Sequence, residues 1–423
     1  MNKTFLLIII LFAALFLRFH NYSVYPQRGA TSDEYTYAFL GLSLMENGIP
    51  TSWSYFGEYT DRQDMNIDGT LFPMVTPYFD HPPLAGLIIG GWSRIRGEET
   101  FAKVKLSTIR IIPILFSMVS AVLLYMLAKN LYGSRVGLWS LAIYSVSPLF
   151  AVSHRVAVSE NILTTFFLAA LTIYSGWKKR VSTPLMVQLG ILSGLGFWTK
   201  ETGVVIFLSI FFLLFIQGER FKMIAQFTLV FLLFILAYIA YGYAYDGQLF
   251  WKIIGLQSAR EIGPASLWYL ISTPIIINKV YHDGWYYFGL LSIFVLAWEK
   301  KHAAVFIPFL TYFTFLIISL TKEGQSGWYL IPLFPFLAIA AGYTLATSIE
   351  QRSLYFLIFV LFIGLFLVQQ LFIPAFGLVP FQFRFLVGIL IVLAVALRRL
   401  QSVWAVALIV GTAVVTLLYV HPA

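Results

Sequence analysis

The chain has 423 residues, of which 59% are hydrophobic and 18% aromatic, and this composition is typical of an integral membrane protein. It contains no cysteine, which excludes disulfides, thiolate catalysis and cysteine-ligated metals. A net charge of +9 would suggest nucleic-acid binding in a soluble protein. In a polytopic protein a bias of Lys and Arg toward cytoplasmic loops explains it, so we expect no nucleic-acid partner.

Apolar stretches long enough for helices recur along the whole chain, which favours helical spans over a barrel. They lie at 4–17, 106–128, 136–153, 159–177, 184–199, 202–217, 222–244, 284–299, 303–320, 327–347, 354–373, 383–397 and 402–420. The first resembles a signal peptide, but no small residues follow it as a cleavage site, so we interpret it as a retained span. Residues 82–95 are shorter than the roughly 20 residues needed to cross, and are predicted to lie in the interface.

The distribution of basic residues sets the predicted orientation. If residues 82–95 do not cross and the N-terminus is cytoplasmic, most Lys and Arg of the short connections fall inside. We therefore predict an all-α polytopic protein with about 13 transmembrane helices, its N-terminus inside and its C-terminus outside, most simply in the plasma (inner) membrane. Long outer loops at 18–105 and 245–283 then mark the extracytoplasmic face as the functional one.

Two adjacent acids, Asp33 and Glu34, follow the first span. Ser32 can cap a helix that starts there, and the apolar spacing of Tyr37, Leu40 and later residues predicts an amphipathic helix lying on the membrane. The simpler interpretation is that both acids only cap this helix. The functional interpretation is a general base at the bilayer surface, where partial desolvation raises a carboxylate pKa toward a useful range.

Other polar groups fall on the same predicted face. A His ahead of Pro-Pro is held rigidly at a helix start, and several tight turns place a cation beside an acid, although a local ion pair would explain each turn alone. The candidates are Asp80 and His81, Arg155 and Glu160, Lys200 and Glu201, Arg260 and His282, Lys322, and Tyr329. Cations near the headgroup plane suit a phosphate, which indicates a lipid-linked phosphorylated substrate. No nucleotide or zinc motif is present, so no cofactor is required, and a divalent metal stays open.

In their order and common sidedness these motifs resemble the GT-C membrane glycosyltransferases. The nearest branches are the protein O-mannosyltransferases and the lipid A aminoarabinose transferases. The motifs are the acidic pair after span one, the HPP turn, the Arg…Glu turn after span three, the lysine after span five and the late Tyr-Leu-x-Pro entry. The resemblance covers roughly residues 1–345, a GT-C-like catalytic module. Residues 346–423 are expected to add transmembrane helices without a soluble domain.

The resemblance implies an inverting transfer of a sugar from a polyprenyl-phosphate donor to an acceptor hydroxyl of a protein, lipid or glycan outside the cytoplasm. It implies that Asp33 is the catalytic carboxylate and that Glu34 supports or positions it. Donor contacts would come from His81, Arg155, Glu160, Lys200, Arg260 and Tyr329, with Asp80, Glu201, His282 and Lys322 as further candidates.

Two residues depart from the aminoarabinose branch. Thr36 stands where that branch has an arginine, and His81 replaces a lysine, which makes its charge depend on pH. A secondary transporter or a lipid-linked-glycan flippase or ligase is the alternative. Transporters usually place charges near the midplane in repeated halves, and this sequence shows neither feature.

Overall fold

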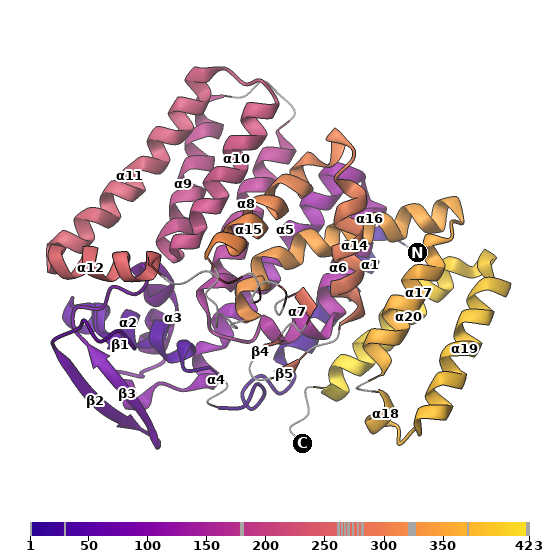
Figure 1. Ribbon diagram of the computed structural model, residues 1–423, viewed down its shortest axis with the longest axis horizontal. Coiled ribbons are helices and arrows are strands. Elements are labelled where there is room, and N and C mark those ends of the chain that lie inside the picture. The colour runs from indigo at the N-terminus through magenta and orange to yellow at the C-terminus, as the bar shows by residue number, and fades with distance from the viewer. Residues whose placement is uncertain are drawn as a thin grey trace.

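The computed structural model describes residues 2–28, 31–177, 182–259, 283–319, 327–369 and 372–419, together with residues 263, 265, 268, 271–272, 275–276 and 279–280. The described chain is almost entirely helical (Figure 1). This confirms the predicted all-α class.

Every apolar stretch predicted as a span is helical. The corresponding helices are α1 (Lys3–Phe19), α4 (Leu106–Ile109) with α5 (Ile111–Tyr132), α6 (Ser134–Val146) with α7 (Pro148–Ser153), α8 (Ser159–Gly176), α9 (Thr183–Thr199), α10 (Val204–Ile216), α11 (Phe221–Tyr245), α14 (Gly284–Leu296), α15 (Ala303–Ser319), α16 (Phe334–Gln351), α17 (Tyr355–Val368), α19 (Pro380–Ala396) and α20 (Gln401–Tyr419). Within the described residues, 5 helices are long and apolar enough to cross a membrane by length and composition. The count of 13 crossings and their orientation stay predictions.

The centre of the bundle is formed by α5, α6, α8 and α16, which pack against one another. α16 is buried along most of its length, whereas α17, α19 and α20 form a separate group at one side (Figure 1). The predicted division at residue 345 falls inside α16 and is therefore not a break between elements. That division stays a prediction.

Residues 82–95 form α3 (Pro83–Ile95), which packs along α2 (Asp33–Asn47). The two helices approach so closely that a Cβ at Gly41 would lie 1.8 Å from the carbonyl oxygen of Gly86. Strand β1 (Ser52–Trp53) contacts α2 as well, and residues Glu34–Ser43 are buried. Within the fold, α3 and β1 therefore cover α2 over these residues, and its predicted position on the membrane surface stays a prediction.

A small antiparallel sheet, which the sequence analysis missed, lies in the first of the two predicted outer loops. Its order is β1–β3–β2, with β2 at Arg62–Ile67 and β3 at Thr70–Val75. The hairpin turns at Asp68 and Gly69, both with positive φ (50° and 81°). Asp-Gly between two extended runs is the usual signal for such a turn, so the sequence did contain it.

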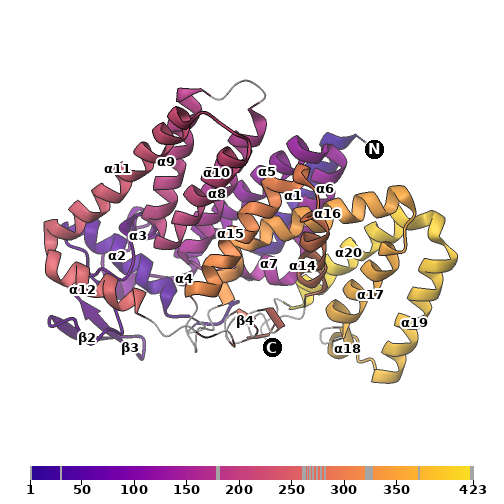
Figure 2. The same cartoon turned by 45° about the horizontal axis from the view of Figure 1, so that its top comes forward.

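Helix α12 (Gly247–Ser258) follows α11 at the same end of the molecule as α2, α3 and the hairpin (Figures 1 and 2). Two contacts hold α11 and α12 there. The Tyr245 hydroxyl donates to the Gly48 carbonyl (2.8 Å), and the Gln257 amide donates to the Asp80 carbonyl (3.2 Å). Parts of both predicted outer loops therefore meet. The remaining described elements are α18 (Phe372–Ala375), β4 (Ile275–Ile276), β5 (Lys279–Val280) and the 3-10 turns η1 (Phe101–Lys103), η2 (Glu201–Gly203), η3 (Lys300–His302), η4 (Gly327–Leu333) and η5 (Arg398–Leu400).

Candidate active site

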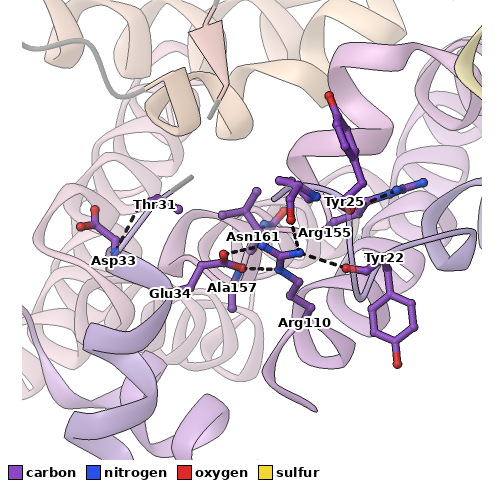
Figure 3. Close-up of polar contacts among 11 residues, drawn as sticks. Tyr22, Tyr25, Thr31, Asp33, Glu34, Arg110, Arg155, Ala157 and Asn161 are labelled. Atoms are coloured by element: carbon purple, nitrogen blue, oxygen red, sulfur yellow. Dashed lines mark hydrogen bonds and ion pairs between the residues drawn. The ribbon is translucent and has the colours of Figure 1, made fainter. Parts of the chain in front are cut away.

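The adjacent carboxylates Asp33 and Glu34 point in different directions from the first turn of α2 (Figure 3). Successive residues of a helix are about 100° apart around its axis, so neighbours cannot serve the same face. Ser32, predicted as the cap, makes no capping hydrogen bond with its side chain, and the Thr31 hydroxyl instead accepts from the Asp33 backbone N–H (3.1 Å). The pair therefore divides into two separate sites.

Glu34 is buried in an ion pair with Arg110, the residue immediately before α5. Arg110 Nε and Nη2 donate to the two Glu34 oxygens, each at 2.8 Å, and the Ala157 backbone N–H donates to the same carboxylate (3.0 Å). Arg110 also donates to the carbonyls of Tyr22 (3.1 Å) and Pro26 (2.7 Å). Glu34 thus fastens α2 to α5 and to the segment that follows α1 (Figure 3).

The Asp33 carboxylate lies on the other side and accepts no hydrogen bond from any residue that the structure describes. Burial raises its pKa above the ordinary value. The positive charges of His81 and Lys200 oppose that effect, whereas the negative charges of Glu160 and Glu34 add to it. Asp33 is therefore a carboxyl group without a described hydrogen-bond donor, within electrostatic range of the Lys200 ammonium and of His81.

Lys200, at the C-terminal end of α9, pairs with Glu160 in the first turn of α8. Its Nζ lies 2.5 Å from Glu160 Oε1, both side chains are buried, and the same Nζ lies 4.4 Å from the centre of the Tyr329 ring in η4. Although burial lowers the pKa of Lys200, the Glu160 charge holds it well above the ordinary value. Three segments far apart in sequence thus build one buried cationic group.

His81 stands directly before the Pro-Pro start of α3, as the sequence analysis expected. Its Nδ1 lies 3.6 Å from a Glu201 oxygen, and its ring stacks on Tyr37 at 5.6 Å with an interplanar angle of 19°. The neighbouring Asp80 accepts from the hydroxyls of Ser54 (2.6 Å) and Tyr59 (2.7 Å). Asp80 therefore anchors the turn to the loop around the small sheet, while His81 faces the site.

Arg155 does not pair with Glu160, and the turn between α7 and α8 is not a local ion pair. Its guanidinium is fully buried and donates to the carbonyl of Tyr25 (3.3 Å) and to that of Leu17. Lys200 likewise pairs with Glu160 and not with its neighbour Glu201. Glu201 instead lies near His81, so neither turn pairs its own adjacent acid and cation. Arg155 braces the end of α1 and does not supply a free cation for phosphate.

Some predicted residues lie outside the described part of the chain. These are Arg260, His282 and Lys322. Among the described residues no group of three His, Cys, Asp or Glu side chains is arranged to hold a metal ion.

The sequence analysis did not identify Arg110, although the sequence contains a feature that could have pointed to it. It is a single arginine at the start of a long apolar stretch, IRIIPIL, where a charge is costly unless it is paired. Tyr37 was noted only as an apolar helix position, yet its hydroxyl lies 2.8 Å from Ser159 Oγ in α8. Ser159 precedes Glu160, so this bond joins α2 to the buried Lys200–Glu160 pair.

Comparison with known proteins shows what the chain is similar to in sequence and in fold. Residues 80–243, which include His81, Glu160 and Lys200, match the dolichyl-phosphate-mannose-protein mannosyltransferase family. A lipid A galacturonosyltransferase, RgtD of Rhizobium johnstonii, is 31% identical over 124 residues, which are 29% of this chain and 25% of that protein. The match thus spans a quarter of the relative's length.

Solved structures of similar fold extend over nearly the whole chain. ArnT of Cupriavidus metallidurans in the apo state superposes with a TM-score of 0.62 at 15% identity, over 99% of this chain and 76% of that one. The same protein bound to undecaprenyl phosphate gives a TM-score of 0.60 at the same identity and coverage. The oligosaccharyltransferase AglB of Archaeoglobus fulgidus, in complex with an inhibitory peptide and a dolichol-phosphate, gives 0.55 at 13% identity, over 100% of this chain and 56% of that one.

The predicted resemblance is thereby confirmed: the chain is a multi-pass membrane protein with the fold of the GT-C glycosyltransferases, and its residues 80–243 match the dolichyl-phosphate-mannose-protein mannosyltransferase family.

Proposed function

We propose that the protein is an inverting glycosyltransferase that moves a sugar from a polyprenyl-phosphate donor to an acceptor hydroxyl on the extracytoplasmic side of the membrane. The observation that carries this proposal is the Asp33 carboxylate, which has no hydrogen-bond donor among the described residues. It lies within electrostatic range of His81 and Lys200. A free carboxylate beside cations is the arrangement that a base-assisted displacement at a phosphate-linked carbon requires.

In the proposed step the acceptor oxygen attacks the anomeric carbon of the donor sugar while Asp33 takes the hydroxyl proton. The bond from the anomeric carbon to the phosphate oxygen breaks, and polyprenyl phosphate leaves with the electron pair. Attack opposite the leaving group inverts the anomeric centre. Negative charge grows on the phosphate during this step, so a cation such as Lys200 stabilises the transition state more than the bound donor.

The comparisons support the choice of donor. The relative that matches in sequence is a lipid A galacturonosyltransferase. The two solved relatives of similar fold were captured with undecaprenyl phosphate and with a dolichol-phosphate. A polyprenyl tail would keep the donor in the bilayer and place its phosphate at the headgroup level, beside the HPP turn. The acceptor is a hydroxyl of a protein, lipid or glycan, and the membrane is the plasma (inner) membrane.

We propose a separate role for each residue of the site. Asp33 is the base, and Glu34 positions it through Arg110. His81 and Lys200, which both act electrostatically on Asp33, are proposed to bind the donor phosphate, with Tyr329 against the Lys200 ammonium. Arg260 retains its proposed contact with the phosphate on sequence grounds alone.

The test is a transfer assay with the purified protein in detergent or nanodiscs. The protein is incubated with polyprenyl-phosphate-linked sugars and with candidate acceptors. Mass spectrometry then measures the release of free polyprenyl phosphate and the mass increase of the acceptor. We expect donor-dependent release by the wild type and none by Asp33→Asn. The lipids that co-purify with the wild type would identify the natural donor, and failure of every polyprenyl-phosphate donor to bind or react would overturn the proposal.

A further inference from the structure

Tyr37 occupies a position between the two cationic groups of the candidate site. It lies four residues after Asp33 on α2, and therefore on the same side of that helix, one turn further along. Its side chain is buried, and its ring stacks on the His81 imidazole at 5.6 Å. One face of this aromatic ring thus fixes the plane in which His81 lies.

The Tyr37 hydroxyl begins a chain of hydrogen bonds. Its oxygen lies 2.8 Å from Ser159 Oγ, and Ser159 in turn donates to Glu160 Oε2 at 3.2 Å. A serine hydroxyl has one proton, and since Ser159 gives it to the carboxylate, Tyr37 must be the donor to Ser159. The direction of both bonds is therefore determined, from Tyr37 through Ser159 to Glu160.

The chain ends at Lys200. One Glu160 carboxylate oxygen accepts a hydrogen bond from the Ser159 hydroxyl, and the other accepts one from Lys200 Nζ at 2.5 Å. With both oxygens bound, the Glu160 carboxylate is fixed in orientation, and the ammonium that it holds is fixed with it. Removing the donor from one oxygen lets the carboxylate rotate and Lys200 move with it.

We infer that Tyr37 is a positioning residue that sets the two cations of the site relative to the Asp33 base, His81 through its ring and Lys200 through its hydroxyl, Ser159 and Glu160. This inference rests on the proposed function, because it assigns to the two cations the phosphate of a lipid-linked donor. The ring of Tyr37 thus orients His81, and the hydroxyl of Tyr37 orients Lys200.

The two tasks predict different kinetic effects. Lys200 acts mainly on the charge that grows as the phosphate leaves, so misplacing it lowers kcat and leaves the KM for the donor nearly unchanged. His81 contacts the donor phosphate in the ground state as well, so freeing its ring raises the donor KM. A residue that only supports the fold would lower the amount of folded protein without such a division.

The first experiment is a double-mutant cycle. Tyr37→Phe keeps the ring and deletes the hydroxyl, and Ser159→Ala deletes the next link. We expect each to lower kcat roughly 10- to 100-fold, the usual effect of a small displacement in an active site, with the donor KM within about twofold of wild type. The double variant should lose no more than the worse single variant, because both changes break the same chain.

The second experiment removes the ring. Tyr37→Leu should lower kcat as Tyr37→Phe does and, in addition, raise the donor KM several-fold. Tyr132→Phe is the matched control, since it also deletes a tyrosine hydroxyl with a side-chain hydrogen bond, in this case to His302 Nδ1 at 2.9 Å, away from this site. It should keep the wild-type kcat and KM.

Wild-type kcat in Tyr37→Phe, or strictly additive losses in the double variant, would overturn the inference while the proposed function stands. A wild-type protein that neither releases nor binds polyprenyl phosphate would overturn the proposed function and this inference with it. If Tyr37→Leu does not fold, the cycle of Tyr37→Phe and Ser159→Ala still decides, because neither change removes packing volume from α2.

Discussion

The sharpest test of the site is Asp33→Asn, a substitution that keeps the shape of the side chain and removes its ability to accept a proton. A general base contributes about 10²- to 10⁴-fold to a rate, so kcat should fall by that factor. The fold should not suffer, because no described residue donates a hydrogen bond to this carboxylate and the substitution therefore leaves no partner unsatisfied.

Stability should change in the opposite direction to activity. Burial raises the pKa of Asp33 in the folded protein, so the folded state binds the proton more tightly than the unfolded chain. The stability that this preference contributes is present at low pH and is lost as the pH rises through the raised pKa. At neutral pH the variant avoids the cost of a buried charge. Its unfolding temperature in detergent should therefore equal or exceed that of the wild type.

The same shift predicts the pH dependence of the wild type. A base must be ionised to act, so kcat/KM should fall as the pH drops, and the fall should begin at a higher pH than for an ordinary aspartate. The assay is release of polyprenyl phosphate between pH 4 and 8, with unfolding temperature measured on the same samples. Asp64→Asn, in the exposed strand β2, is the matched control and should behave as wild type. An Asp33→Asn protein with near-normal turnover, or one that is inactive only because it unfolds early, would refute the assignment.

Two further predictions concern the buried ion pairs, and a third concerns the orientation of the chain in the membrane. Glu34→Gln should destabilise the protein by about 3–5 kcal/mol in denaturant unfolding, because it leaves Arg110 buried without its counter-ion; a neutral effect would contradict the pairing. Glu160→Gln should destabilise similarly, and adding Lys200→Met should restore part of the loss, whereas additive losses would count against a coupled pair. A single cysteine placed within residues 98–104 of this cysteine-free chain should react with an impermeant reagent from the extracytoplasmic side, and labelling only from the cytoplasm would reverse the predicted orientation.

Most of the helices could be predicted from the sequence, because hydropathy is a local property that can be evaluated without knowledge of tertiary contacts. Each apolar stretch became a helix, and residues 82–95 became α3 beside α2 instead of a long apolar helix. The polar groups expected to share one face include His81, Glu160, Lys200 and Tyr329, and the structure does bring these together. The basis of that prediction was the bias of charge between loops, which does not require knowledge of any contact.

The partners of those groups depended on the tertiary structure. Asp33 and Glu34 look equivalent in sequence, but the turn of a helix sends one toward the site and the other to Arg110, 76 residues away. Lys200 pairs with Glu160 across 40 residues and not with the adjacent Glu201. Neighbours in sequence on a rigid turn point in different directions, whereas residues from separate helices can meet face to face.

The sequence by itself therefore determined that the chain forms apolar helices and which polar residues lie in the connections between them. Only the tertiary structure decided which carboxylate is free. A buried carboxylate needs a cation or a hydrogen-bond donor as its partner. Which carboxylates find one depends on how the helices pack, for example on the close approach of Gly41 to Gly86. Glu34, Asp80 and Glu160 each have such a partner, whereas no described residue donates a hydrogen bond to the Asp33 carboxylate, which is why we propose Asp33 as the base.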